Sequence, residues 1–340
     1  MSELIRFCSL RRLIASIAAS ATLVFALVGQ ARAEVQEVRI AYQHSMAFLV
    51  VDVLLAKRMI QSRAAAAGLD GITVNAVRFA SGPAANEALL KGDVEVGGAG
   101  LAPFLELWAS TRGTANVRGL APINDSPLYL ITTNSTVQSV KDLAPSAKVA
   151  VTAPNSIQGL FLRMLADRHY GNARHLDPAM VSMTSIDAMK ALRADGPLSA
   201  YVGSIPFNLT ALALPGAREI ANSFEFIGGA HTLVSLFVTE KFKTENPKTF
   251  AVLCAAIDDA MAFIKANPSE TAEIFSQASK GATPPSLVME ILGRKDVAYA
   301  TTPRGTMAFA ATMSTLGLLK TVPATWQDVY WEHLHARDGS

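Results

Sequence analysis

The stretch FASGPAANEALLKGDVEVGGAGLAPF, residues 79–104, contains a complete structural unit. It begins with a Ser-Gly-Pro corner, continues through a short amphipathic segment to Gly92, and ends in an apolar run with glycines before Pro103. The stretch MTSIDAMKALRADGPLSAYVGSIPF, residues 183–207, repeats the same order of features. Neither copy carries an obvious catalytic group, so the repeat has to be explained first as architecture.

The sequence around the first copy alternates between strand and helix patterns. Residues 37–43 and 72–79 read as strands, and an apolar helix is predicted between them over residues 46–67. Ser81 stands at the N-cap position of a helix that should end at Gly92, and residues 94–100 form the next strand. Alternating strands and helices with short connections favour a parallel sheet that is covered on both faces.

The second half of the chain restarts this pattern. Residues 148–153, 179–183 and 198–204 read as strands, and residues 157–170 read as a helix. Two successive strands without a helix between them, residues 117–125 and 126–134, suit a passage from one lobe to another. Residues 231–239 should form the strand that returns to the first lobe.

The pattern therefore predicts an α/β protein with two doubly wound lobes. The first lobe would contain residues 34–125, and the second would contain residues 126–235 with hinge strands at its ends. Residues 236–340 would return to the first lobe, where mainly helical segments cover its outside. A chain of 340 residues, half of them hydrophobic and 17% charged, is long enough to bury a core in each lobe.

Residues 1–33 have the pattern of a secretory signal peptide. Three arginines precede an uncharged run over residues 13–29, and Ala-Arg-Ala at 31–33 offers a cleavage site before Glu34. The alternative is an uncleaved membrane anchor. Removing the segment's four arginines and one glutamate from 30 basic and 28 acidic residues leaves a net charge near −1. We expect a periplasmic protein, and this charge leaves no footprint for nucleic-acid binding.

The few cysteines and histidines indicate no metal or cofactor. Only Cys254 remains after cleavage, so no intramolecular disulfide is possible, and its apolar helical surroundings favour a buried small side chain over a nucleophile. The six histidines have no metal-ligand spacing. His44, at the end of a strand, is the one that we consider as a ligand contact, and His231 is a weaker candidate.

Six corners between strands and helices are rich in Ser, Gly and Asn. They are Gln43-His44-Ser45, Ser81-Gly82-Pro83, Gly100-Leu101-Ala102, Asn155-Ser156, Thr184-Ser185 and Gly203-Ser204. In open parallel sheets, ligands bind beyond the carboxyl ends of the strands, where helix N-termini present free N–H groups and partial positive charge. Any single corner could be an ordinary helix cap. Six of them on a duplicated unit predict a binding cleft between two lobes.

Three segments carry a resemblance to a known family. VRFASGPAANEALLKGDVEVGGAG (77–100), VTAPNSIQGLFLRML (151–165) and AREIANS (217–223) resemble the periplasmic substrate-binding proteins of ABC importers. The likeness covers residues 39–273 and is greatest to the branch that takes aliphatic sulfonates, taurine and nitrate, which has thiamine-precursor-like relatives. It implies a type II periplasmic-binding-protein fold with a two-strand hinge. A monomer would close on its ligand and then dock on the permease subunits.

The chain departs from that family pattern in the second lobe. It has Pro-Asn-Ser-Ile-Gln at 154–158, where relatives often have a Gly-Ser pair followed by a His on the next turn. It also has AYVGSIPF at 200–207, where relatives often have a more aromatic strand. The identity of the ligand is therefore left open.

The corners supply the candidate ligand-binding residues. They are His44, Ser45, Ser81, Gly82, Gly100 and Leu101 on one side, and Asn155, Ser156 and Ser204, with Tyr201 as a wall, on the other. Because none is Arg or Lys, amides and hydroxyls would neutralise any ligand charge. Apolar neighbours such as Met46, Phe48 and Phe207 suit a solute with a hydrocarbon portion. We expect a small organic anion or polar solute of the sulfonate, taurine or nitrate class, and no catalytic residue.

Two alternatives stay open at this point. An enzyme on the same fold, of the desulfinase or thiamine-precursor-synthase type, would need a nucleophile or acid–base cluster at the cleft. A sensory ligand-binding module would have the same cleft as an importer component. The neighbouring genes would separate the last two, because a permease and an ATPase favour uptake whereas a kinase favours sensing.

Overall fold

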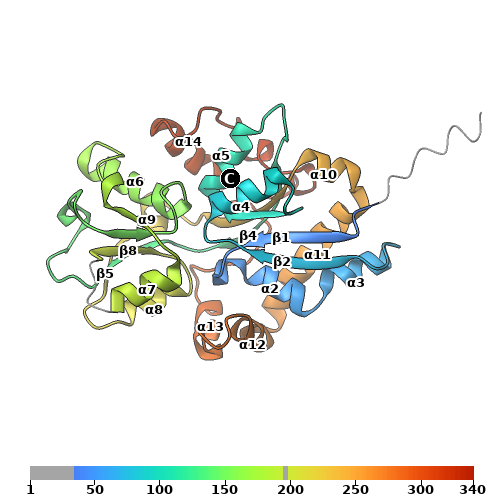
Figure 1. Cartoon of the computed structure of the whole chain (residues 1–340), viewed down its shortest axis with the longest axis horizontal. Coiled ribbons are helices and arrows are strands. Elements are labelled where there is room, and N and C mark those ends of the chain that lie inside the picture. Colours follow the sequence, from blue (N-terminus) through green and yellow to red (C-terminus); the bar gives the residue numbers. More distant parts are fainter. Residues whose placement is uncertain (1–33, 194–197) are drawn as a thin grey trace, which may run out of the picture. The chain divides into compact units, whose positions relative to one another are not determined.

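The computed structural model describes residues 34–193 and 198–340 (Figure 1). Contacts divide the chain into Met1–Glu34 and Val35–Ser340, and the description below concerns the second unit. The predicted signal peptide, residues 1–33, lies outside the described residues.

The strands that we call the first sheet form a two-stranded sheet and a three-stranded sheet, which an isolated bridge joins. β1 (Glu37–Tyr42) pairs in parallel with β2 (Thr73–Arg78), and a parallel bridge from Ile40 to Val96 connects β1 to the segment before β3 (Gly97–Gly100). β10 (Thr232–Val238) then lies antiparallel between β3 and β4 (Arg118–Asp125). The predicted return strand is therefore confirmed. The prediction of a wholly parallel sheet is wrong, because β10 runs antiparallel to both of its neighbours.

The helices after β1 differ from the prediction in one respect. One helix was predicted over residues 46–67, but the chain forms η1 (Met46–Phe48), α2 (Leu49–Ala56) and α3 (Met59–Ala66). The break falls at Arg58, whose φ of 49° lies in the left-handed region that a helix cannot continue through. α2 is buried along most of its length, as a helix packed against a sheet should be.

The repeated unit folds as its sequence predicts. In the first copy, α4 (Gly82–Lys91) begins after Ser81 and ends at Gly92, whose φ of 78° suits glycine. β3 follows, and α5 (Leu101–Ser110) begins directly after it. In the second copy, β7 (Met180–Ser182) precedes α7 (Ser185–Arg193), and β8 (Ala200–Gly203) precedes α8 (Phe207–Leu212).

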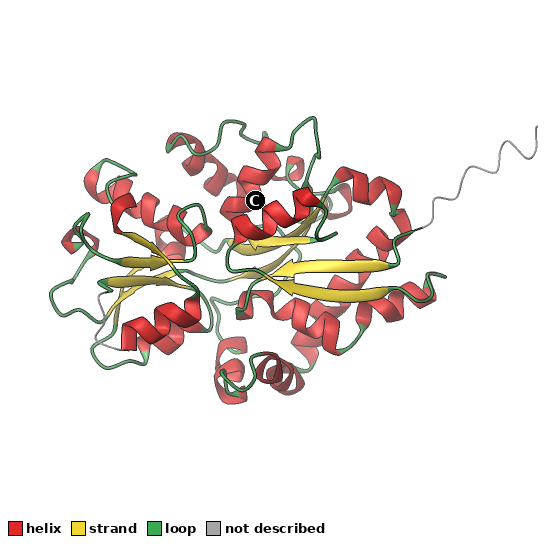
Figure 2. Ribbon diagram, viewed as in Figure 1, coloured by secondary structure: helices red, strands yellow, loops and turns green. Residues whose placement is uncertain are grey.

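The second sheet has the order β7-β6-β8-β5-β9. β6 (Val149–Val151) pairs in parallel with β7 and β8, whereas β5 (Tyr129–Thr132) is antiparallel to β8 and to β9 (Arg218–Asn222). α6 (Ile157–Tyr170) follows β6, and the short α9 (Ser223–Ile227) follows β9. The short helices η2 (Val140–Asp142) and η3 (Asp177–Ala179) lie in its connections. Helices lie on both faces of each sheet (Figure 2).

Two connections join the sheets, one from β4 to β5 and one from α9 to β10. A buried hydrogen bond from the Leu128 N–H to Ser223 Oγ, at 2.8 Å, ties the two connections together. Ser223 Oγ also lies 2.8 Å from His231 Nε2, and His231 Nδ1 lies 3.0 Å from the carbonyl oxygen of Thr232. The crossing point therefore contains a chain of buried polar groups.

The C-terminal helices are α10 (Glu240–Glu245), α11 (Pro247–Ala266), α12 (Pro268–Ala278), α13 (Pro285–Leu292) and α14 (Thr306–Thr315), with the short η4 (Trp326–Asp328) and η5 (Glu332–Leu334). They pack on the first sheet's side of the unit: α11 contacts α2, α3 and β4, and α14 contacts α5. No helix in the described part of the chain is both long and apolar enough to cross a membrane.

Candidate functional site

A cavity of about 140 Å³ lies where the corners of the two sheets meet. Its walls contain small polar residues interleaved with apolar ones from both sheets. The lining residues are Gln43, His44, Ser45, Ala47, Phe48, Phe79, Ala80, Gly82, Gly100, Pro103, Thr152, Ser156, Ile157, Gln158, Thr184, Ser185, Ile186, Ser204, Leu233 and Val234. None of them is Asp, Glu, Lys or Arg, so the walls carry no formal charge when His44 is neutral.

The corner after β1 forms part of the first wall and makes hydrogen bonds to a residue that follows a strand of the second sheet. Ser45 Oγ accepts a hydrogen bond from Ala47 N at 3.1 Å, which caps η1, and it donates to the carbonyl oxygen of Ile205 at 2.7 Å. Met46 N–H donates to the same carbonyl at 3.2 Å. Two hydrogen bonds thus link the first corner directly to the residue before Pro206.

Gln43 occupies the same corner and has a fixed orientation. Its side-chain Nε2 donates to the carbonyl oxygen of Gly98 at 3.1 Å. Because a carbonyl oxygen only accepts hydrogen bonds, the contacting atom must be the amide nitrogen, and the Gln43 Oε1 is left for another donor.

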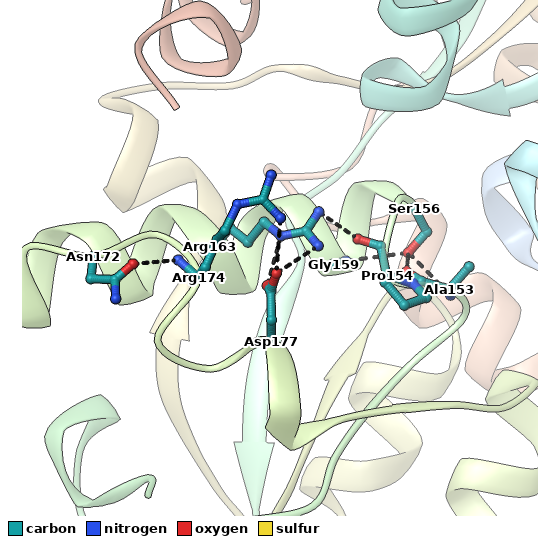
Figure 3. Close-up of polar contacts among 8 residues, drawn as sticks. All are labelled: Ala153, Pro154, Ser156, Gly159, Arg163, Asn172, Arg174 and Asp177. Atoms are coloured by element: carbon teal, nitrogen blue, oxygen red, sulfur yellow. Dashed lines mark hydrogen bonds and ion pairs between the residues drawn. The ribbon is translucent and has the colours of Figure 1, made fainter. Parts of the chain in front are cut away.

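The corner before α6 forms the opposite wall. Ser156 Oγ caps α6 by accepting from Gly159 N at 3.2 Å, and it donates to the carbonyl oxygen of Ala153 at 2.6 Å. Arg163 holds this corner from behind, because its Nη1 donates to the carbonyl oxygen of Pro154 at 3.0 Å while its Nε lies 2.8 Å from Asp177 Oδ1 (Figure 3). The wall is therefore positioned by a partly buried ion pair outside the cavity.

Gln158 lies in the first turn of α6 and is more than nine-tenths buried, with an exposed fraction of 8%. Its Oε1 accepts a hydrogen bond from Thr152 Oγ1 at 3.0 Å. Both residues line the cavity. The interaction leaves the amide N–H groups of Gln158 without a hydrogen-bond partner among the described residues.

Four helices begin at the cavity. Gly82, Gly100, Ser156 and Ser185 line it and stand at or immediately before the first residues of α4, α5, α6 and α7. Free N–H groups and partial positive charge collect at helix N-termini, and each can favour an anion by about 0.3–1 kcal/mol. The backbone therefore makes the cavity suitable for a negatively charged or strongly hydrogen-bond-accepting group.

His44 adds a polar ring but no charge. Burial, and to a lesser extent the positive charge of Arg78, lower the pKa of His44. Its ring lies 6.1 Å from that of Phe275 and 6.2 Å from that of Phe207, measured between ring centres. At neutral pH the imidazole can therefore donate or accept one hydrogen bond within a partly aromatic surrounding.

Six of the ten predicted residues lie together at this cavity: His44, Ser45, Gly82, Gly100, Ser156 and Ser204. Their contact with a ligand stays a prediction. The remaining four lie elsewhere. Ser81 caps α4 behind the wall, and Leu101 is fully buried in the core. Asn155 lines a separate groove of about 580 Å³ beside α4 and α5. Tyr201 packs in the apolar cluster of the second sheet with Ala188 and Leu192.

Several lining residues were not predicted as contacts, above all Gln43, Thr152, Gln158 and Ile157. Gln43 is adjacent to His44 in one of the six polar corners between strands and helices, so proximity could have identified it. Gln158 lies two residues after its helix cap, and only the rotation of α6 decides that it faces inward.

The other candidate residues for chemistry lie apart from the cavity. Cys254 is half-buried on α11, and burial raises the pKa of its thiol to about 12, which disfavours the thiolate. His231 is fully buried at the crossing point between the sheets. In residues 34–193 and 198–340, no group of three or more His, Cys, Asp or Glu side chains could hold a metal ion.

Solved structures resemble this architecture over most of its length. The alkanesulfonate-binding protein SsuA from Xanthomonas axonopodis pv. citri, bound to MOPS, is 22% identical with a TM-score of 0.65, covering 85% of this chain and 96% of that chain. The periplasmic nitrate-binding protein NrtA from Synechocystis PCC 6803 is 13% identical with a TM-score of 0.68, covering 89% and 88%.

A third solved structure names the fold itself. The CA3427 gene product of Candida albicans, described as exhibiting the generic periplasmic binding protein fold, is 14% identical with a TM-score of 0.66, covering 88% of this chain and 97% of that chain. At these identities the likeness shows the fold, which is the one that the sequence predicted.

The sequence comparisons give the family. No curated protein matches the chain. The model of the NMT1-like family matches residues 27–279, which is well over half of the sequence. The chain belongs to the NMT1-like family.

Proposed function

We propose that this protein is an extracytoplasmic solute-binding protein that captures a small organic anion or polar solute and delivers it to an ABC permease. The observation that carries the proposal is the convergence of four helix N-termini and their small polar corners on one cavity that lacks formal charges. The solved relatives with this fold include sulfonate- and nitrate-binding proteins, which supports an oxyanion ligand.

The cavity size limits the ligand. An apolar protein cavity of roughly 150 Å³ holds a molecule the size of benzene, with about six non-hydrogen atoms. The present cavity of about 140 Å³ therefore suits a solute of about that size. Phe48, Phe79 and Ile157 would contact its hydrocarbon part, and the helix N-termini would contact its head group.

Closure would bring the two walls onto the ligand. The lobes would move about the two connections, residues 126–128 and 228–231, and the hydrogen bonds from Ser45 and Met46 to Ile205 would form in the closed state. A ligand that contacts both walls stabilises that state, which a permease can then recognise. The walls supply hydroxyls and amides rather than a nucleophile with a neighbouring carboxylate, which favours capture over turnover.

A thermal-shift screen of the exported protein tests the proposal. Sulfonates, carboxylates, nitrate and pyrimidines are the test ligands, and small organic cations are the controls. A ligand present at 100 times its dissociation constant stabilises the native state by about 2.7 kcal/mol, so at least one oxyanion should raise the melting temperature clearly. A rise with the cations and none with the oxyanions would contradict the proposal.

A further inference from the structure

We infer that the cavity distinguishes the two ends of its ligand, which is a small oxyanion carrying a neutral hydrogen-bond donor such as a hydroxyl group. Gln158 would donate to the oxyanion head, and Gln43 would accept from the donor at the other end. The inference rests on the proposed function and names the substrate class of the same cavity.

The head-group side is the N-terminus of α6. Gln158 presents amide N–H groups without a partner among the described residues, because its Oε1 is already engaged by Thr152 Oγ1 at 3.0 Å. The Gln158 Nε2 atom is not one of the buried unpaired polar atoms, so it is accessible from the cavity, where an acceptor in the ligand can take its hydrogen bond. Gln158 is more than nine-tenths buried and lies in the helix turn that carries partial positive charge, so an anionic acceptor fits best.

The tail side is the corner after β1. Gln43 Nε2 is engaged by the Gly98 carbonyl oxygen at 3.1 Å, so its Oε1 has no hydrogen-bond partner within residues 34–193 and 198–340, and the residue lines the cavity. A ligand hydroxyl or amide N–H could donate to it. The two glutamines therefore present opposite hydrogen-bonding groups. Gln158 is oriented by Thr152, which also lines the cavity, and Gln43 is oriented by the carbonyl oxygen of Gly98.

The absence of carboxylates from the lining decides which donor is accepted. An ammonium group needs a counter-charge when it leaves water, and no lining residue is Asp or Glu. The four helix N-termini would also repel a cation. A hydroxyl has neither difficulty, so a hydroxyalkyl oxyanion should bind more tightly than the unsubstituted anion, and the aminoalkyl anion should bind least tightly.

Calorimetry with matched ligands tests this order without any variant. The sulfonate series is ethanesulfonate, 2-hydroxyethanesulfonate and 2-aminoethanesulfonate, and the carboxylate series is propanoate and 3-hydroxypropanoate. In the series that binds, the hydroxyl should tighten binding by about tenfold, the typical effect of one buried hydrogen bond. The series that binds identifies the head group.

Two variants assign the roles of the glutamines. Gln43→Met should abolish the preference for the hydroxyl, so that the variant binds ethanesulfonate and 2-hydroxyethanesulfonate with equal affinity. Gln158→Met should weaken all anions of the series by about tenfold and keep the preference. Circular dichroism and the unfolding midpoint of each variant check that it is folded.

The outcomes separate the inference from the proposed function. If no anion of either series binds, oxyanion capture is wrong and the inference falls with it. If the anions bind but the hydroxyl gives no gain, or Gln43→Met keeps the gain, the proposed function stands and the inference is overturned. Tighter binding of 2-aminoethanesulfonate than of ethanesulfonate would also overturn it.

Discussion

In the first copy of the repeated unit, Gly100 is the last residue of β3. It lies against Ile157 of α6, a helix that follows a strand of the second sheet. A Cβ atom placed there would lie 2.7 Å from Cγ2 of Ile157 on α6. In the second copy, Gly203 stands at the matching position, three residues before the Pro-Phe pair. A Cβ atom there would lie 2.6 Å from Cε1 of Tyr201 and 3.2 Å from Cα of Asn208, both of which are near in sequence.

The same contrast appears at the next residues along the chain. The second copy offers the carbonyl oxygen of Ile205, which receives hydrogen bonds from Ser45 and Met46. The first copy offers no such acceptor at Ala102, which is buried within α5. The shared sequence pattern gives each copy the same order of strand and helix, although α5 begins directly after β3 and α8 begins only at Phe207. Contacts with other segments decide which copy packs closely across the gap and which receives hydrogen bonds.

The two glycines give the largest expected effects. Gly203→Ala should lower the free energy of unfolding by about 1–3 kcal/mol, the usual cost of overpacking a filled interior. Gly100→Ala should instead weaken binding of 2-hydroxyethanesulfonate by about tenfold, because the new methyl group pushes Ile157, and the wall that carries it, away from Gly100. Urea unfolding and calorimetry on both variants measure the two quantities. Equal stability losses with unchanged affinity would remove the distinction between the copies.

The two copies lie on different sheets, and the buried hydrogen bonds of Ser223 and His231 lie where these sheets are joined. The effect of pH on stability tests this junction. Burial lowers the pKa of His231 to about 4. Because the unfolded chain binds a proton near pH 6.5 and the folded chain does not, stability is fully present above 6.5 and is lost as the pH falls toward 4. Between pH 7 and pH 4.5, His231 alone should lower the free energy of unfolding by about 2 kcal/mol.

His231→Gln should lack that acid-dependent loss, so its difference from the wild type should narrow as the pH falls. Urea unfolding at pH 7 and pH 4.5 measures this difference. Ser223→Ala provides the control, since it removes the partner of His231 Nε2 but keeps the titrating ring. A parallel pH dependence in the wild type and His231→Gln would show that His231 is not the group responsible.

The parts of the fold that local sequence determines were predicted. Ser81 and Gly92 delimit α4 because capping and left-handed geometry depend on neighbouring residues. The antiparallel entry of β10 between β3 and β4 was not, because strand pairing is decided by contacts far apart in sequence. The break between α2 and α3 at Arg58 was not predicted either, because no Gly, Asn or Pro lies there to indicate it.

The candidate site follows the same division. His44, Ser45, Gly82, Gly100, Ser156 and Ser204 could be placed at the cavity because corners at strand ends converge in this kind of sheet. Tyr201 could not, since its strand turns the ring into the second sheet's apolar cluster. Gln158 could not either, because the direction of a side chain in the first turn depends on how α6 is rotated against the sheet.

Ser45→Ala tests the hydrogen bond that crosses to the second copy. Losing the donor to Ile205 O should weaken ligand binding by about fivefold, since a single hydrogen bond contributes about 1 kcal/mol. Calorimetry with 2-hydroxyethanesulfonate measures the loss. Thr239→Ala is the matched control, because Thr239 caps α10 through Phe242 N at 3.1 Å and does not line the cavity. It should lower stability and leave affinity unchanged; a loss of affinity there would mean that binding responds to any weakened cap.

The smallest expected effects come from the two helix caps of the repeat. Ser81 Oγ accepts from Ala84 N at 3.5 Å, whereas Thr184 Oγ1 accepts from Asp187 N at 3.2 Å and donates to Asp187 Oδ2 at 2.7 Å. Ser81→Ala should therefore lower the free energy of unfolding by about 0.5 kcal/mol and Thr184→Ala by about 1 kcal/mol. Only Thr184 lines the cavity, so only its variant should also weaken anion binding, by about twofold. Weaker binding by Ser81→Ala at unchanged stability would instead make Ser81 a ligand contact, and the corners of the two copies would then be equivalent.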